Sequence, residues 1–81
     1  MKIRIETTDE LSSLLPGGEE ETAIEMVDGA TPHDALDHLG ISKDSGYLLV
    51  VNEAIVPKAN RDMLKLSDGD TLQILPPLKG G

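Results

Sequence analysis

Residues 31–40 read TPHDALDHLG, and they carry the start and stop signals of one helix. Thr31 is a cap residue followed by proline at the first helical position, and Asp34 stands where a capping box places an acid. Gly40 supplies the residue that most readily adopts the left-handed conformation at a helix end. One apolar stripe is formed by Ala35, Leu36 and Leu39. The stretch therefore predicts a helix with a single buried face.

Apolar residues alternate or run together on both sides of this helix, as expected of strands. Before it, Met1, Ile3 and Ile5 alternate with charged residues, and residues 21–27 place Thr22, Ile24 and Met26 on one face. After it come a nearly unbroken apolar run at 47–51, a short segment at 54–56 that Pro57 restricts to an edge, and a last strand at 71–75.

The connections also carry local signals. Asp9 is expected to cap a short helix that buries Leu11, Leu14 and Leu15 and stops at Pro16-Gly17-Gly18. Asn52-Glu53 and residues 67–70 (Ser-Asp-Gly-Asp) predict turns. Residues 58–66 are expected to form a loop with one helical turn that tucks Met63 and Leu64 underneath.

The predicted order β-α-β-α-β-β-β combines helical crossings with hairpins. It indicates an α+β fold with a mixed sheet of about five strands and helices packed on one face. We expect one domain over residues 1–75 and an extended, flexible C-terminal tail over residues 76–81.

Composition excludes several classes of function. The chain has 81 residues, no cysteine and a formal charge of −8, so it offers neither a thiolate site nor the basic face that nucleic acid requires. Tyr47 is the single aromatic residue, which leaves no platform for stacked bases. No apolar run is long enough to span a membrane, and residues 1–5 alternate unlike a signal peptide, so we expect a cytoplasmic protein.

No constellation for catalysis or metal binding stands out. His33 and His38 are five residues apart, which does not place both imidazoles on one helical face for a metal. Asp68-Gly69-Asp70 lacks the remaining ligands of a calcium loop and is interpreted as a turn.

The C-terminal residues carry the strongest functional signal. The sequence closes on Gly80-Gly81, a stem without side chains that can enter a narrow channel and present the Gly81 carboxylate. Pro76 and Pro77 favour an extended exit from the last strand, which lowers the entropic cost of insertion into a partner. We expect Leu75 and Leu78 to help dock the tail and Lys79 to meet an acidic rim or a phosphate. Such a carboxylate is inert until adenylation, and that ATP site must lie on another protein.

Four segments together resemble the MoaD/ThiS family of ubiquitin-like sulfur carriers, which have the β-grasp fold. They are residues 30–40 (ATPHDALDHLG), 51–56 (VNEAIV), 66–70 (LSDGD) and 74–81 (ILPPLKGG). The double proline before the diglycine looks most like the small subunit of molybdopterin synthase. Lys79, where that type usually has a small residue, and Asn52-Glu53, where the family commonly has Asn-Gly, depart from the pattern.

The resemblance implies a carrier that is not itself an enzyme. A ubiquitin-activating-type adenylating enzyme (MoeB/ThiF-like) would use ATP and magnesium to adenylate Gly81, and a sulfur donor protein would convert it to a thiocarboxylate. The tail would then enter the large molybdopterin synthase subunit (MoaE-like) or another sulfur-accepting enzyme.

In this reading Gly81 is the covalent site, Gly80 gives clearance, and the residues from Leu75 to Lys79 dock. Three alternatives remain open: a sulfur carrier for thiamine or another metabolite, a protein modifier that forms isopeptide bonds through Gly81, and a β-grasp binding module whose tail is never activated.

Overall fold

A computed structural model describes residues 1–42, 44 and 46–77 of the chain. Their strands are β1 (Lys2–Thr7), β2 (Glu21–Glu25), β3 (Leu48–Val51), β4 (Ala54–Ile55) and β5 (Thr71–Leu75). The α-helix is α1 (Pro32–Leu39), and the 3₁₀ helices are η1 (Asp9–Leu14), η2 (Pro16–Gly18) and η3 (Lys58–Asn60). The expected strands and their order along the chain are thus confirmed, with β2 ending two residues early, β3 beginning one residue late and β4 ending one residue early.

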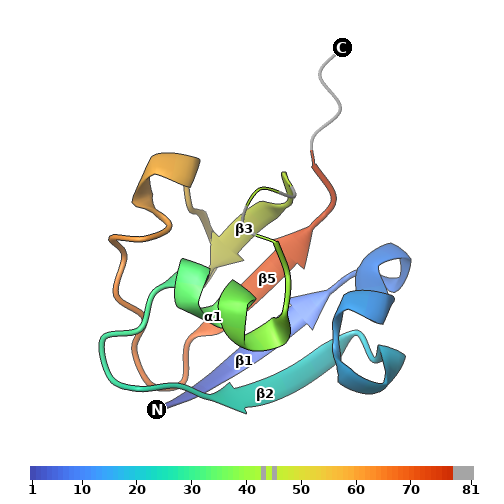
Figure 1. The fold of residues 1–81 in the computed structure, drawn as a ribbon, viewed down its shortest axis with the longest axis horizontal. Helices are drawn as coiled ribbons and strands as arrows, with labels where there is room; N and C mark the ends of the chain where they lie inside the picture. The colour runs from blue at the N-terminus through green and yellow to red at the C-terminus, as the bar shows by residue number, and fades with distance from the viewer. Residues whose placement is uncertain (43, 45, 78–81) are drawn as a thin grey trace.

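The strands form one mixed sheet in the order β2-β1-β5-β3-β4. β1 is antiparallel to β2 and parallel to β5, while β3 is antiparallel to both β5 and β4. Because β1 and β5 run in parallel, β5 ends on the side of the molecule opposite the N-terminus (Figure 1). The expected edge position of residues 54–56 is confirmed in β4.

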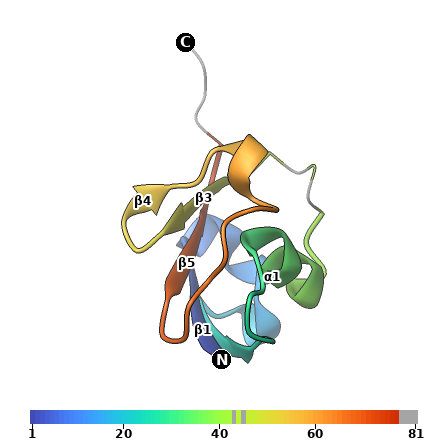
Figure 2. The same cartoon turned by 90° about the vertical axis from the view of Figure 1, so that its left-hand side faces the viewer.

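The hydrophobic core lies between the sheet and α1, which covers one face of the sheet (Figure 2). Alternation along the strands sends Ile3 and Ile5 of β1 and Leu72 and Ile74 of β5 into this core, each with 0% exposure. Leu49, Val50 and Val51 of β3 are all buried, as the apolar run predicted. Burial of this sheet face and the apolar stripe of α1 is the main source of folding free energy.

The helix signals of residues 31–40 are all realised in α1. The Asp34 backbone N–H donates to Thr31 Oγ1 at 3.3 Å, and the Thr31 N–H donates to Asp34 Oδ2 at 2.9 Å. Gly40 ends the helix in the left-handed region at φ 74°. Ala35 and Leu36 are buried, and Leu39 packs partly buried against the core.

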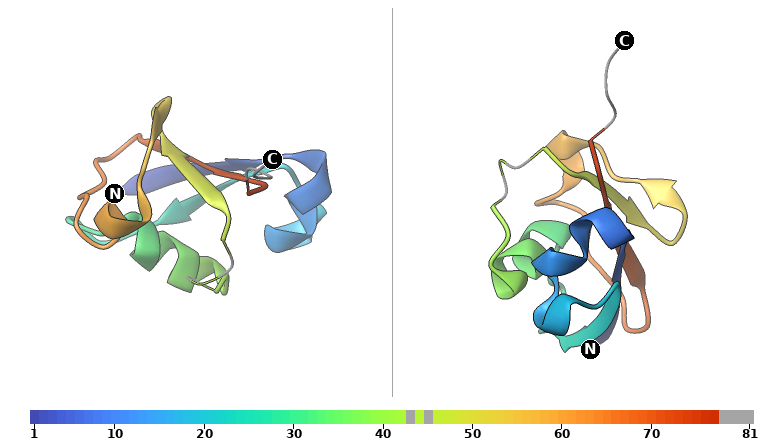
Figure 3. Two further views of the ribbon diagram at one scale, coloured as in Figure 1. Left: turned by 90° about the horizontal axis from the view of Figure 1, so that it is seen from above. Right: turned by 90° about the vertical axis from the view of Figure 1, so that its right-hand side faces the viewer.

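The first predicted helix differs in its type and its cap. It is a 3₁₀ helix whose N-cap is Thr8, without a capping side-chain bond, so the expectation that Asp9 caps it is wrong. Six residues before Pro16 leave little room for α-helical hydrogen bonds, and the tighter helix fits such short segments. Leu15 is nevertheless buried, and η1 and η2 stand together at one end of the sheet (Figure 3).

The two predicted turns are confirmed and are joined to each other. Asn52 and Glu53 both have positive φ, 47° and 73°, which lets a two-residue turn connect β3 and β4. Asn52 Nδ2 donates to Asp70 Oδ1 at 2.8 Å, and the Thr71 N–H donates to Asn52 Oδ1 at 3.0 Å. The turn therefore also fixes the start of β5.

The loop after β4 corrects one expectation. Met63 and Leu64 do not tuck underneath: their side chains are 72% and 39% exposed. The buried positions of this loop are Arg61 and Leu66, at 4% exposure each. The Leu66 N–H donates to the Ala30 carbonyl at 2.8 Å, and this bond sets which loop residues face inward.

Among the described residues, no helix has the length and apolar character needed to cross a bilayer. The tail expected over residues 76–81 lies outside the described residues from Leu78 onward.

The capping box makes a stability prediction. Replacing Thr31 by alanine removes the acceptor for the Asp34 N–H, and we expect unfolding free energy to fall by about 1 kcal/mol in urea titrations. Thr31→Ser keeps the hydroxyl and is the matched control. Equal losses in both variants would show that the cap bond does not stabilise α1.

Candidate functional site

The root of the C-terminal tail is the best-defined element of the candidate site. β5 is paired on both sides up to its last residues: Thr7 lies opposite Ile74, and Leu48 lies opposite Leu75. Thr7 Oγ1 also donates to the Ile74 carbonyl at 2.6 Å. Pro76 and Pro77 follow, and neither has an N–H to continue the ladder, so the chain must leave the sheet here.

An apolar strip borders this root on the sheet face opposite α1. Residues opposite each other in neighbouring strands share a face, and the register pairs Leu48 with Leu75 and Val50 with Ile55. Ile55 is 60% exposed, and Leu48 and Leu75 are half-buried. The expected docking residue Leu75 therefore stands beside other exposed apolar surface.

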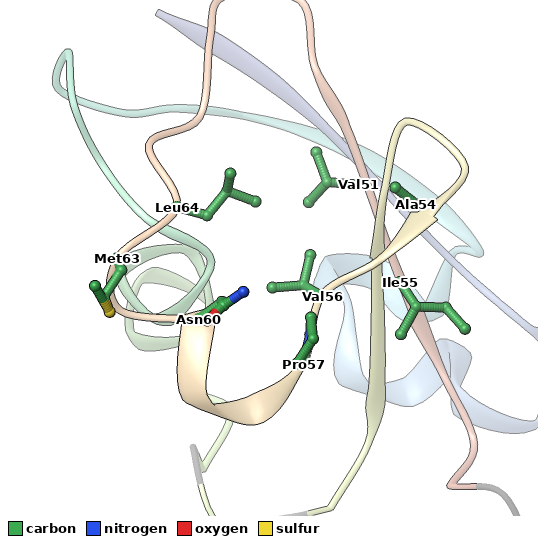
Figure 4. A pocket seen from close by; sticks show the side chains of 8 residues that line it. All are labelled: Val51, Ala54, Ile55, Val56, Pro57, Asn60, Met63 and Leu64. Atoms are coloured by element: carbon green, nitrogen blue, oxygen red, sulfur yellow. The ribbon is translucent and has the colours of Figure 1, made fainter.

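A hollow of about 490 Å³ lies between the β3–β4 hairpin and the loop that follows it. Leu64 faces Val51 and Val56 across it, and Met63 stands at its rim (Figure 4). The full lining is Val51, Ala54, Ile55, Val56, Pro57, Asn60, Met63 and Leu64. Exposed apolar side chains at a hollow of this kind are typical of surfaces that contact other molecules.

A smaller hollow of about 210 Å³ meets the tail root itself. Its lining includes Pro77, Tyr47, Pro57, Lys58 and Arg61. It shares Ile55, Val56 and Pro57 with the larger hollow, so the two form one surface around β4. Burial lowers the pKa of Arg61 from its ordinary value, because removal of a guanidinium from water disfavours its charged form.

Charged groups elsewhere behave as solvated surface. Arg4 donates to Glu21 Oε2 at 2.7 Å and lies 3.1 Å from Glu6 Oε2, and the bond to Glu21 raises the pKa of Arg4. Within the described part of the chain, no cluster of three or more His, Asp or Glu side chains is arranged to hold a metal ion. His38 is exposed, whereas His33 is half-buried.

The structure places three of the seven predicted site residues. Leu75 and Pro76 are half-buried at the end of β5, and Pro77 is exposed and lines the smaller hollow. Leu78, Lys79, Gly80 and Gly81 lie outside the described residues. Their assigned roles therefore stay predictions.

Sequence reasoning missed the surface beside the tail. The sequence predicts an edge strand for Ile55, which is confirmed, and burial of Met63 and Leu64, which is wrong; it does not predict that these three exposed side chains line one hollow. Arg61 was given no role although it is buried. The available signal was weak: two adjacent apolar residues between Asp62 and Lys65 have a pattern equally compatible with burial and exposure.

The mixed sheet, its order and the helix on one face define the class of ubiquitin-like, β-grasp proteins. The model of the ThiS family matches residues 9–81, and the chain belongs to this family of ubiquitin-like sulfur carriers. A search of curated proteins found no significant match.

Solved structures from three organisms show the same fold. Small archaeal modifier protein 1 of Haloferax volcanii has TM-score 0.74 and 18% identity, covering 95% of this chain and 98% of that one. One chain of the complex between subunits 1 and 2 of molybdopterin-converting factor from Helicobacter pylori has TM-score 0.64 and 22% identity, with 100% of each chain covered. The thiamine biosynthesis protein ThiS of Geobacter metallireducens has TM-score 0.64 and 14% identity, covering 96% and 99%.

The exposure of Met63 can be tested by comparison with Leu66. We expect Met63→Ala to change the free energy of unfolding by less than about 0.5 kcal/mol, because the side chain is 72% exposed. Leu66→Ala removes a buried side chain and should cost about 2–5 kcal/mol in the same urea titration. A similar cost for both variants would mean that Met63 is buried in solution.

Proposed function

We propose that this chain is a sulfur carrier whose Gly81 carboxylate is adenylated, converted to a thiocarboxylate and used to donate sulfur in molybdopterin biosynthesis. Membership of the ThiS family supports the carrier role. The double proline before the diglycine favours the molybdopterin branch, since it resembles the small subunit of molybdopterin synthase.

The observation that carries this proposal is the way β5 ends. The strand is paired with β1 through Ile74 and with β3 through Leu75, and the two prolines that follow have no N–H with which to extend the ladder. A rigid root with a short stem lets a partner hold the folded domain at one site while the last residues enter another. Little entropy is lost on insertion, because proline has already restricted the stem.

The chemistry assigns the catalytic groups to partner proteins. The Gly81 carboxylate attacks the α-phosphorus of ATP, pyrophosphate leaves with magnesium assisting, and the acyl-adenylate forms in a MoeB/ThiF-like enzyme. A persulfide on the donor protein then displaces AMP, so that the C–S bond of an acyl disulfide replaces the C–O bond. A second thiol cleaves the S–S bond, becomes part of a disulfide with the donor's sulfur, and releases the thiocarboxylate. The thiocarboxylate enters a MoaE-like large subunit, where its sulfur passes to the precursor. This chain supplies the carboxylate and the docking surface.

Protein modification is the second candidate function, and Lys79 favours it. Leu78-Lys79-Gly80-Gly81 resembles the ending of ubiquitin more than the small residue usual in molybdopterin carriers. The same adenylate could then pass Gly81 to a lysine amine and form an isopeptide bond. Sulfur transfer to thiamine or to another metabolite would use the same thiocarboxylate and differ only in the acceptor enzyme.

Deleting Gly81 tests the covalent step. In the native host, intact mass of the full chain should show one oxygen replaced by sulfur, and the Gly81 deletion should lose this form. The melting temperature should stay unchanged, because the last strand, β5, ends at Leu75, six positions before the deleted residue. A variant lacking Gly81 that still supports molybdopterin formation would overturn the proposal.

Proteome digestion separates the second function from the first. Trypsin cleaves after Lys79, so modified lysines in host proteins would carry a Gly-Gly remnant that disappears when the gene is deleted. Lys79→Ala, compared with Lys65→Ala as a control, shows whether the remnant derives from this chain. Remnants of this origin, without any thiocarboxylate form, would favour the modifier over the carrier.

A further inference from the structure

Arg61 is a cation buried within the part of the chain that the structure describes. Its side chain is 4% exposed, and across residues 1–42, 44 and 46–77 no carboxylate forms an ion pair with it. Among these same described residues, the Arg61 Nε has no hydrogen-bond partner either. Buried charges in proteins are normally paired, because an unpaired one loses its hydration without compensation.

The structural bonds of Arg61 account for its position but not for its charge. One guanidinium nitrogen donates to the Tyr47 carbonyl at 2.7 Å, and the Arg61 carbonyl accepts from the His33 N–H at 3.1 Å. The first bond needs a donor, which a neutral amide could supply, and the second uses only the backbone. Neither bond requires the positive charge of the guanidinium, so these bonds do not explain why the buried residue is an arginine.

The location of this charge points to a role for it. Arg61 lines the hollow of about 210 Å³ that Pro77 also lines, so the guanidinium lies beside the root of the tail. Exposed Lys58 contributes a second positive charge to the same hollow. Most of the other lining is apolar, from Tyr47, Leu48, Ile55, Val56, Pro57 and Pro77. Apolar walls lower the local dielectric and strengthen an ion pair formed there.

The distribution of charge along the chain agrees. Residues 1–45 hold 11 acidic and 3 basic residues, whereas residues 46–81 hold 4 of each. Every residue that lines the hollow belongs to the second, neutral part. An acidic group can thus approach the tail root without the repulsion that the strongly acidic part would exert.

We propose that the hollow formed by Arg61, Lys58 and Pro77 receives the side-chain carboxylate of an aspartate or glutamate on the adenylating enzyme that takes up the tail. A carboxylate matches the planar guanidinium in shape and supplies the missing counter-ion. Binding of this acid next to Pro77 orients the stem as it enters the partner. The inference rests on the proposed docking of the tail, and it adds a specific anchor to it.

Acetate is the direct probe of this hollow. In ¹⁵N-labelled protein, the Arg61 Nε–Hε signal and the Lys58 amide should shift saturably with sodium acetate but not with sodium chloride at equal ionic strength. Arg61→Gln should abolish the Lys58 shift. No saturable response to acetate, or a stronger one to inorganic phosphate, would overturn the assignment to a carboxylate.

The partner itself provides the second test. The assay is pyrophosphate exchange by the adenylating enzyme of the same organism, followed as a function of the concentration of this carrier chain. Lys58→Glu should raise KM about tenfold with kcat unchanged, because it places an acid where the partner's acid docks. Lys65→Glu makes the same charge change on the same loop but outside the hollow, and it should leave KM unchanged. An equal rise in KM for both variants would mean that only the net charge of the carrier matters, and this would contradict the proposal.

The two tests separate this inference from the proposed function. If the wild-type chain is not adenylated, the carrier proposal fails, and the acetate titration still decides whether the hollow binds carboxylates. If adenylation proceeds and Lys58→Glu behaves as wild type, the carrier proposal stands and the anchor is wrong. Because Lys58 is exposed, this variant should fold even if Arg61→Gln does not.

Discussion

Strand β5 is hydrogen-bonded to β1 on one side and to β3 on the other, and most of the structure depends on this position. Its inward side chains, Leu72 and Ile74, are fully buried against α1. A parallel pair of strands needs a crossover connection, so the chain between β1 and β5 must travel around the whole domain. Strand β2, helix α1, the β3–β4 hairpin and the loop that contains η3 all lie between β1 and β5 in the sequence.

The same strand connects the core to the predicted site at the C-terminal end of the chain. Each ladder bond that stabilises β5 also fixes the point at which the tail departs, up to the Thr7 bond to the Ile74 carbonyl. Proline then prevents further pairing, and the neighbouring ends of β3 and β4 supply exposed apolar side chains. Stability and presentation of the tail therefore come from one set of contacts.

The loop between β4 and β5 divides its side chains unusually. Met63 and Leu64 face solvent while Arg61 is buried, the reverse of what transfer free energies of isolated side chains would favour. Backbone bonds from Leu66 to Ala30 and from His33 to Arg61 hold the loop in this arrangement. The loop gives up some apolar burial, and it leaves exposed apolar side chains and a hollow lined by Lys58, Arg61 and Pro77.

Much of the fold followed from local patterns in the sequence. Alternation gave the strands, and Thr31, Pro32, Asp34 and Gly40 gave the limits of α1, because capping and periodicity involve residues a few positions apart. Likewise, the diglycine and the double proline predicted from the sequence alone that the C-terminal tail is the functional site. Only the tertiary structure decided the helix type of η1, the exposure of Met63 and Leu64, and the burial of Arg61 beside Pro77. These depend on contacts between residues distant in sequence, such as Arg61 with Tyr47 and Leu66 with Ala30, and no local pattern encodes which of them form.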